Sequence, residues 1–447
     1  MVGCEIANYS VDSADEIESV FMIKSMENFR KKTKKSRQWR AIQLFAFLLV
    51  LTSGGIYSCG EAEPDPSTQP LPEVFAQKME DTLKDRGIGY AFAIYEGTQL
   101  MAKGSGGFQS RSNDPEGQKD FTPDTKMHIA SMTKTLSAMA FLKTANQKGV
   151  KTTDLIAPYL PPTWQLGAGI SQITFGDLLT HKSGIKGLSG SCLNGSDSEN
   201  NYDGLKKIIA LGVTSRGTYC YQNANFGLFR VLIPRILGYT FTGKDATDDA
   251  QTQQRYLAFL QQEIFEKAGI QNVVTTFPAN NPTYTYNVPI TTAQKGWNPG
   301  NFSQVFGGYG MYLTATEAGK IYASALSSGT NEVLTTALAD SLIVKNLGCY
   351  KASSGLGTMV YHDGLWFDWI NPVGRGLRTL WVKFPNNITC VLFVNALHYQ
   401  NNSLVFPFNN GNIVSFIYNA YAKAVQARGA RISAEAASLY IEHPEPH

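Results

Sequence analysis

Charged residues are scarce in this chain. Asp, Glu, Lys and Arg make up 17% of its 447 residues, whereas hydrophobic residues make up 43%. This composition excludes long disordered tracts and supplies enough apolar surface for one large domain or two modest ones. The formal net charge is only +3, and no basic face of the kind that nucleic-acid binding needs is indicated. We therefore expect no nucleic-acid partner.

Residue patterns that hold metals are also missing. The chain has six His and six Cys, and no group of them has the spacing of metal ligands. We therefore expect neither a metal nor a cofactor.

The N-terminal region lacks a hydrophobic run long enough to cross a bilayer, which takes about 20 residues. Its apolar run, 41–51, follows a basic cluster and leads through small residues to Cys59. That order is typical of a secretory signal peptide, so we interpret residues 1–58 as the signal region, with an uncleaved signal anchor as the alternative. Residues 1–25 do not resemble the start of a signal peptide. They are either an extension or lie before the true start at Met22 or Met26, and we favour the second interpretation.

The segment Ile56-Tyr57-Ser58-Cys59 resembles the lipobox of bacterial lipoproteins, although Tyr57 is bulkier than that pattern usually carries. The resemblance implies that Cys59 is acylated and tethers an exported protein to a membrane that it does not cross. The location would be the cell envelope, on the periplasmic or outer-membrane side. We interpret residues 59–70 as a solvated tether, 71–428 as the folded domain and 429–447 as a loose tail.

Four cysteines remain besides Cys4 and Cys59. An exported protein can oxidise them, and four cysteines allow three pairings between which the sequence does not choose. We favour a bond between the first two, because both flank motifs that we expect to converge; buried free thiols are the alternative. The four residues are Cys192, Cys220, Cys349 and Cys390.

Strand patterns lie towards both ends of the domain and helical patterns fill the middle. This order predicts an α/β fold with one antiparallel sheet built from both chain ends, flanked by the terminal helices and carrying an inserted, mostly helical lobe. The expected helices are 71–86, 131–147, 175–179, 203–211, 226–237, 255–268, 315–326 and 412–426, and the expected strands are 89–95, 100–108, 357–362, 378–384 and 388–395.

The first motif with catalytic chemistry is Ser131-Met132-Thr133-Lys134, at the start of an apolar helix. Residues three apart share a helix face, so the amine of Lys134 can lie beside the hydroxyl of Ser131. A serine hydroxyl needs such a neighbour to become a nucleophile, and a helix start offers N–H groups for an oxyanion. The alternative is a first-turn serine followed by a surface lysine.

The second motif is Tyr221-Gln222-Asn223, which follows a glycine-containing turn. A tyrosine near cations can act as a general base, and the Asn223 amide can hold both Lys134 and a substrate carbonyl. An ordinary core tyrosine is the alternative.

The third motif is His362-Asp363-Gly364, at the end of a strand pattern. A strand edge beside the nucleophile can supply an N–H to an oxyanion hole, and Gly364 lets a substrate approach closely. A simple turn between strands is the alternative.

In this order and spacing the three motifs resemble the serine β-lactamase and penicillin-binding-protein superfamily, above all its class C β-lactamase-related hydrolases. Leu178–Gly184 resembles the group's Leu-Leu-Thr-His-Thr-Ser-Gly segment, with Lys182 in place of a small hydroxyl residue. Gly307–Tyr312 resembles its Gly-Gly turn. The resemblance covers roughly residues 71–426.

Functional roles follow from the resemblance, motif by motif. Ser131 would be the acylated nucleophile, Lys134 its electrostatic partner and possible base, and Tyr221 the general base and acid. The substrate would be bound by Asn223, His362, Gly364 and Leu365, with the N–H groups of Ser131 and Leu365 forming the oxyanion hole.

The sequence departs from the family pattern at His362, where many relatives carry Lys. A histidine with the reference pKa of about 6.5 is mostly neutral at pH 7, and Asp363 adds negative charge, so the clamp on a substrate carboxylate would be weaker. We therefore expect a serine hydrolase of small esters, amides or peptides. The alternatives are a penicillin-binding sensor without efficient turnover and a true β-lactamase. The aromatic run 366–369 either lines the site or packs in the core.

Overall fold

The computed structural model describes residues 65–192, 197–272, 274–328, 333–368, 375–400, 403–406, 412–429 and 439–441. The predicted signal region and the lipidation site at Cys59 lie outside these ranges. Within them, no helix is both long and apolar enough to cross a bilayer.

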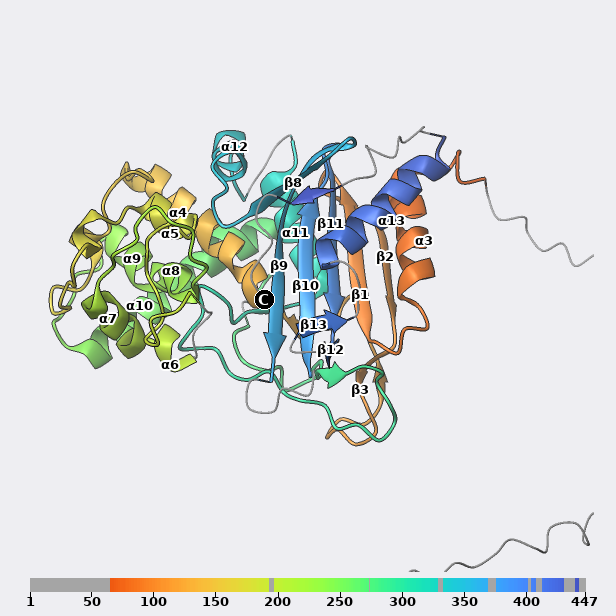
Figure 1. The fold of residues 1–447 in the computed structure, drawn as a ribbon, viewed down its shortest axis with the longest axis horizontal. Helices are drawn as coiled ribbons and strands as arrows, with labels where there is room; N and C mark the ends of the chain where they lie inside the picture. Colours follow the sequence, from red (N-terminus) through yellow and green to blue (C-terminus); the bar gives the residue numbers. More distant parts are fainter. Residues whose placement is uncertain are drawn as a thin grey trace, which may run out of the picture. The chain divides into compact units, whose positions relative to one another are not determined.

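One large sheet occupies half of the molecule (Figure 1). Its strands β2, β1, β11, β10, β9, β8 and β14 are antiparallel neighbours in that order, and β6, β12 and β13 continue from the end of β10. The pairing of β6 with β12 is parallel. The strands span Tyr90–Glu96 (β1), Gln99–Gly106 (β2), Tyr286–Asn287 (β6), Tyr350–Ser354 (β8), Gly357–Phe367 (β9), Gly376–Lys383 (β10), Ile388–Val394 (β11), Ala396–Gln400 (β12), Ser403–Phe406 (β13) and Tyr440–Ile441 (β14).

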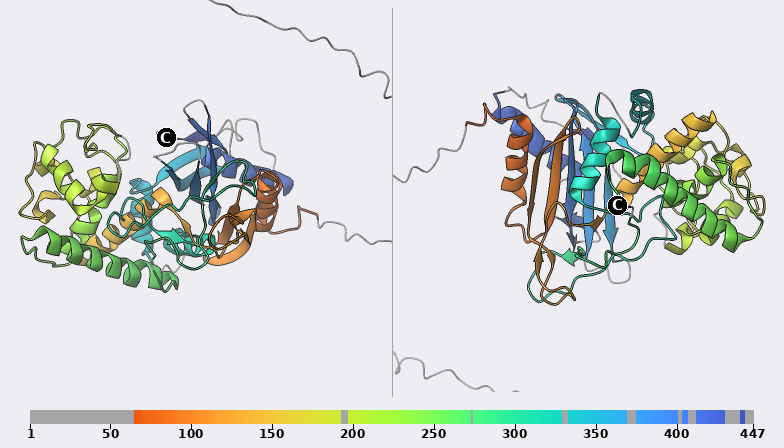
Figure 2. Two further views of the ribbon diagram at one scale, coloured as in Figure 1. Left: turned by 90° about the horizontal axis from the view of Figure 1, so that it is seen from below. Right: turned by 180° about the vertical axis from the view of Figure 1, so that it is seen from behind.

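Both faces of the central strands β1, β10 and β11 are buried. Successive side chains of a strand point to opposite faces, and in β1 Phe92 and Ile94 belong to one apolar cluster whereas Ala91 and Ala93 belong to the other. Helices α3 (Leu71–Leu83) and α13 (Ile413–Ala427) pack together over the first face. Helix α11 (Ala315–Leu326) covers the second, as Figure 2 shows from behind.

The helical lobe lies beside the sheet (Figure 1), and α4 (Thr133–Lys148) is its buried centre. Every residue of α4 from Thr133 to Leu142 is buried, and Gly149 ends the helix in a left-handed conformation. The other helices of the lobe are α5 (Phe175–Leu179), α6 (Asp197–Asn200), α7 (Tyr202–Leu211), α8 (Asn223–Gly227), α9 (Phe229–Ile236) and α10 (Asp245–Leu260), and α12 (Thr336–Val344) follows α11.

The predicted architecture is confirmed, with four corrections to its parts. The strand expected over 357–362 continues to Phe367, so the third motif lies inside a strand and not in a turn at its end. The helix expected from residue 255 begins at Asp245, and its first ten residues were not predicted because only Ala246 and Ala250 among them are apolar. The helix expected over 226–237 is two helices, α8 and α9, that meet at Leu228. The tail is not entirely loose, because Tyr440–Ile441 pair with β8.

Two short strand pairs and several single turns of helix complete the described fold. The strands β3 (Phe108–Ser110) and β4 (Lys119–Asp120) pair with each other, and β5 (Met127–His128) pairs with β7 (Tyr312–Leu313). The second pair leads directly into the segment that carries Ser131.

Candidate active site

Ser131 lies in a single 3-10 turn, Ala130–Met132, that leads into α4. Ala130 has a φ of 46°, a conformation that is costly for a residue with a side chain and that turns the chain sharply before the helix. Ser131 is buried, with 7% of its surface exposed.

Lys134 is fully buried, one turn further along. Its ammonium group donates hydrogen bonds to Ser131 Oγ at 2.9 Å, Asn223 Oδ1 at 2.7 Å and the carbonyl oxygen of Gly308 at 2.8 Å. Three acceptors match the three protons of an ammonium group, which allows a cation to remain at a site that water does not reach.

Tyr221 completes the surroundings of the nucleophile from the other side. Its hydroxyl donates to Ser131 Oγ at 2.8 Å, and Lys134 Nζ lies 4.7 Å from the centre of its ring. Tyr221 therefore contacts both the nucleophile and its lysine neighbour.

Two glycines bring Asn223 and the Gly308 carbonyl to Lys134. A side-chain Cβ at Gly308 would lie 2.8 Å from the carbonyl oxygen of Asn223, and one at Gly307 would lie 2.8 Å from that of Phe226. The Gly-Gly turn can therefore approach the start of α8 closely. The family resemblance includes this turn, but it did not predict that the Gly308 carbonyl accepts a hydrogen bond from Lys134.

The third motif lies on β9, at the edge of the sheet that faces Ser131. Strand β8 pairs with β9 only as far as Tyr361. Beyond that point, β10 is the only strand among the described residues that pairs with the backbone from His362 to Phe367. A Cβ at Gly364 would lie 2.8 Å from the carbonyl oxygen of Ile129, so glycine allows β9 to pass beside the turn that carries Ser131. Leu365 is the next residue on this edge.

The structure therefore brings all seven predicted site residues to one region, with direct hydrogen bonds joining four of them. His362 is buried, its Nδ1 lies 2.6 Å from the carbonyl oxygen of Asp363, and its ring lies 5.1 Å from that of Tyr350. The carboxylate of Asp363 lies 3.2 Å from the guanidinium group of buried Arg378. The negative charge that was expected to weaken anion binding is therefore balanced by a cation.

His181 supports the segment that carries Tyr221, a role that the sequence did not reveal. Its Nδ1 accepts hydrogen bonds from the backbone N–H of Gln222 and from Asn225 Nδ2, and its ring lies 4.4 Å from the ring of Tyr221. Burial and, to a smaller extent, the charges of Lys134 and His362 hold its pKa well below the ordinary value, so the ring is neutral and Nδ1 can accept. The only signal in the sequence was its place in the segment 178–184.

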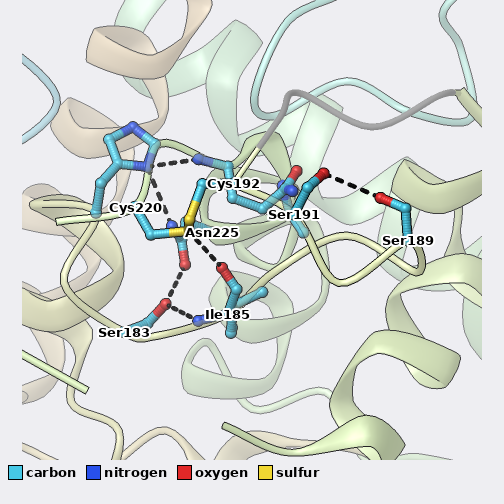
Figure 3. The surroundings of a disulfide bond; sticks show 10 residues. Ser183, Ile185, Ser189, Ser191, Cys192, Cys220 and Asn225 are labelled. Carbon is cyan, nitrogen blue, oxygen red and sulfur yellow. Dashed lines mark hydrogen bonds between the residues drawn. A yellow bond between two sulfur atoms is a disulfide. The ribbon is translucent and has the colours of Figure 1, made fainter. Parts of the chain in front are cut away.

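A disulfide bond joins Cys192 to Cys220, which confirms the favoured pairing (Figure 3). Cys220 directly precedes Tyr221, and its N–H donates to the carbonyl oxygen of His181 at 2.8 Å. The other two cysteines, Cys349 and Cys390, are buried free thiols, as the alternative interpretation proposed.

In the aromatic run after the third motif, Trp366 belongs to the core, whereas Phe367 is half-buried. Trp366 is only 9% exposed, and its ring packs against His128, Phe302 and Tyr309. Trp369 lies outside the described residues. Among the described residues no group of three or more His, Cys, Asp or Glu could hold a metal ion.

Comparison with known proteins places this geometry in context. A family model described as Beta-lactamase matches residues 73–405. A Bacillus subtilis (strain 168) protein named "Putative penicillin-binding protein PbpX" is 24% identical over 349 residues, which are 75% of this chain and 76% of that protein.

Three solved structures illustrate the likeness in fold. The class C beta-lactamase from Rhodobacter sphaeroides is 16% identical with a TM-score of 0.53, over 80% of this chain and 98% of that one. The beta-lactamase/D-alanine carboxypeptidase from Yersinia pestis, complexed with citrate, is 17% identical with a TM-score of 0.55, over 74% and 94%. The octameric penicillin-binding protein homologue from Pyrococcus abyssi is 16% identical with a TM-score of 0.54, over 80% and 76%.

Proposed function

The chain belongs to the beta-lactamase family of serine hydrolases, and from that premise we propose that it hydrolyses small esters, amides or peptides through an acyl-enzyme formed at Ser131. The observation that carries the proposal is the pair of hydrogen bonds at Ser131 Oγ, to Lys134 at 2.9 Å and to Tyr221 at 2.8 Å. Both neighbours are titratable groups, and either can take a proton from a hydroxyl once it has lost its own.

In the proposed acylation, Tyr221 first gives up its proton beside the Lys134 cation, and Ser131 Oγ then attacks the substrate carbonyl carbon while its own proton passes to the Tyr221 oxygen. Negative charge develops on the carbonyl oxygen, and the N–H groups of Ser131 and Leu365 stabilise it. When the bond to the leaving group breaks, Tyr221 returns a proton to that group. Water then attacks the acyl-enzyme, and the same residues transfer its proton to Ser131.

The remaining residues bind and orient the substrate. The Oδ1 atom of Asn223 accepts from Lys134, and the family resemblance assigns this residue to the orientation of the substrate. Gly364 keeps the edge of β9 close to the nucleophile, and His362 borders the same edge with a smaller side chain than the lysine of many relatives.

A fluorophosphonate probe tests the nucleophile directly. The wild type should be labelled at Ser131 and should hydrolyse a short-chain aryl ester, and Ser131→Ala should lose both properties. Ser105→Ala, on β2 at the far side of the sheet, is the matched control and should keep both. A wild type without labelling would contradict the assignment of Ser131.

One observation favours a second candidate, because the Bacillus subtilis relative is named as a penicillin-binding protein. A sensor that acylates without turnover would be labelled by a fluorescent penicillin and would hydrolyse no member of a panel of esters, amides and lactams. Rapid hydrolysis of nitrocefin in the same panel would instead identify a true β-lactamase.

A further inference from the structure

A network of buried hydrogen bonds leads from Ser183 to the segment that carries Tyr221. The backbone N–H of Ile185 donates to Ser183 Oγ at 3.0 Å, and the Ser183 hydroxyl donates in turn to Asn225 Oδ1 at 2.5 Å (Figure 3). Because Oδ1 is thereby identified as the acceptor end of the Asn225 amide, the atom 3.0 Å from His181 Nδ1 is the NH₂ group. The network therefore presents a hydrogen-bond donor to His181.

Two donors determine where the proton of the His181 ring lies. The Asn225 NH₂ group and the backbone N–H of Gln222, at 3.2 Å, both donate to Nδ1, so this atom carries no proton. Burial holds the pKa of the ring well below its ordinary value, so the ring is neutral and its single proton is on Nε2. His181 also lines a cavity of about 70 Å³, in which a water molecule, needing roughly 10–15 Å³, has room to accept that proton.

His181 contacts the chain on both sides of Tyr221. Its carbonyl oxygen accepts from the backbone N–H of Cys220 at 2.8 Å, and its Nδ1 atom accepts from that of Gln222. Between these two bonds, the ring of His181 lies 4.4 Å from the ring of Tyr221, with an angle of 32° between the two planes. One residue therefore fixes three consecutive residues, 220 to 222.

The backbone of His181 has an unusual conformation. Its φ of 56° lies in the left-handed region, which is unfavourable for a residue with a Cβ atom. Strain of this kind persists only where surrounding contacts fix the residue, and it is concentrated at functional sites. Here the contacts with residues 220–222 fix it, which marks His181 as a residue whose exact placement matters.

We propose that His181 is a positioning residue for acyl transfer, which holds the Tyr221 hydroxyl at Ser131 Oγ through the bond between Nδ1 and the Gln222 N–H. The inference rests on the proposed hydrolase function and deepens it, because it adds a residue that controls the general base. His181 acts only through Tyr221 and transfers no proton. Displacement of a catalytic group by about 1 Å can slow a reaction by about 10²-fold, so loss of this bond should be visible in the rate.

Two substitutions of His181 separate the Nδ1 acceptor from the backbone conformation. His181→Asn places an amide oxygen close to the position of Nδ1, and asparagine tolerates a positive φ. His181→Gly tolerates the same φ but removes the acceptor. Stopped-flow acylation by 4-nitrophenyl acetate gives the rate constant and the dissociation constant of the ester separately. In the glycine variant the rate constant should fall by about 10- to 100-fold and the dissociation constant should change by less than about threefold. The asparagine variant should keep the rate constant within about threefold of the wild type.

Two further variants control for position and for the network. Asn281→Gly is the matched control, because Asn281 also has a positive φ, 55°, and its amide oxygen accepts from Gln109 on β3. It should acylate at the wild-type rate. Ser183→Ala should slow acylation by about three- to tenfold in the wild type but by less than about twofold in His181→Gly, because the orientation of Asn225 matters only while Nδ1 is present.

Two results would overturn the proposal. One is acylation of His181→Gly at the wild-type rate, which would reduce His181 to a residue of the turn. The other is a His181→Asn variant as slow as His181→Gly although both are folded, which would show that the Nδ1 acceptor does not set the rate.

Hydrogen exchange separates this inference from the proposed function, because it needs no turnover. In Ser131→Ala, mass spectrometry of peptides that cover residues 219–224 should show a protected N–H at Gln222. The added His181→Gly change should speed its exchange by about tenfold or more, and His181→Asn should restore most of the protection. Exchange in α4 should stay unchanged, which reports that each variant is folded.

The two proposals then fail in different ways. Protection of the Gln222 N–H that depends on residue 181, without ester turnover by the wild type, would sink the hydrolase and keep the contacts that place Tyr221. A Gln222 N–H that exchanges equally fast in all three proteins would sink the role of His181, whatever the activity.

Discussion

At the scale of single residues, the site depends on a buried lysine. Lys134 donates to a hydroxyl, an amide oxygen and a backbone carbonyl, and these oxygens carry only partial charges. The arrangement leaves Lys134 as a source of positive potential for Ser131 and Tyr221, and this potential favours the charges that acyl transfer creates.

Replacement of Tyr221 by phenylalanine tests whether its hydroxyl moves the proton. We expect the fold to remain intact and acyl transfer to slow by about 10²-fold or more, which is the contribution of a general base. Stopped-flow measurement of acylation by an aryl ester gives the rate. Tyr95→Phe removes a hydroxyl that bonds to Thr316 on α11, so it is a matched control and should acylate at the wild-type rate. Full activity of Tyr221→Phe would assign the base to Lys134 alone.

His128 makes the folded state sensitive to acid. Its ring is fully buried between Phe302 and Trp366, its two nitrogens have no hydrogen-bond partner among the described residues, and burial lowers its pKa to about 3. In the unfolded chain the pKa is near 6.5, so below that pH the unfolded state binds a proton that the folded state does not. The free energy of unfolding therefore falls as the pH falls from 6.5 towards 3.

We expect His128→Phe to remove this dependence. Between pH 7 and pH 5 one such histidine costs about 2 kcal/mol of unfolding free energy, so the variant should lose about 2 kcal/mol less than the wild type over this range. Urea denaturation at the two pH values measures the difference. Thr144→Val changes an equally buried polar residue that does not titrate, and its effect should be the same at both pH values. An unchanged pH dependence in His128→Phe would show that its ring is protonated in the folded state.

At the scale of elements, the predictions held where a periodic pattern of apolar residues exists. The helix over 71–83, the hairpin of β1 and β2 and the helix α11 could all be read from their periodicity and their bounding turns. The first ten residues of α10 were not predicted to be helical because Ala246 and Ala250 are the only apolar residues among them. In the first turn of that helix, Asp248 accepts hydrogen bonds from the N–H groups of Thr242 and Gly243. These bonds join the helix to the preceding turn, and a search for apolar periodicity does not detect them.

The disulfide bond constrains the element that carries Tyr221. It closes a loop between residues 28 apart, and Cys220 is the direct neighbour of Tyr221. We expect Cys192→Ser/Cys220→Ser to lower the free energy of unfolding by about 2–4 kcal/mol, because the unfolded chain gains freedom. Ester hydrolysis should also slow by several-fold, because Tyr221 loses the support beside it. Chemical denaturation and steady-state kinetics measure the two effects.

Treatment with a reductant provides the control for this prediction. The wild type in dithiothreitol should acquire the properties of the double serine variant, and the double variant itself should not respond. Cys349→Ala removes a buried free thiol, so it should retain the response of the wild type to reductant. If mass spectrometry showed the bond reduced while hydrolysis stayed unchanged, the coupling between the bond and Tyr221 would be wrong.

At the scale of the whole molecule, the site is assembled from segments that local patterns cannot connect. Ser131 meets Tyr221 across 90 residues, and Lys134 reaches Gly308 across 174. The motifs could be found in the sequence because they occur in the same order as in a known family. That resemblance predicted which distant segments meet in the fold. The cavity beside His181 could not be found in this way, because only the packing of the lobe against the sheet brings its lining residues together.

The placement of the whole molecule in the cell depends on Cys59, and we propose that a lipid at this residue anchors an exported protein to the cell envelope. Two or more acyl chains hold a protein at a membrane, since each buried CH₂ contributes about 0.8 kcal/mol. Cys59→Ser should therefore move the protein from the membrane fraction to the soluble fraction and abolish incorporation of radiolabelled palmitate. Ser58→Ala keeps a small residue before the cysteine and should retain the lipid. If Cys59→Ser remained in the membrane fraction and its mass included residues 41–51, the uncleaved signal anchor would replace the lipid as the attachment.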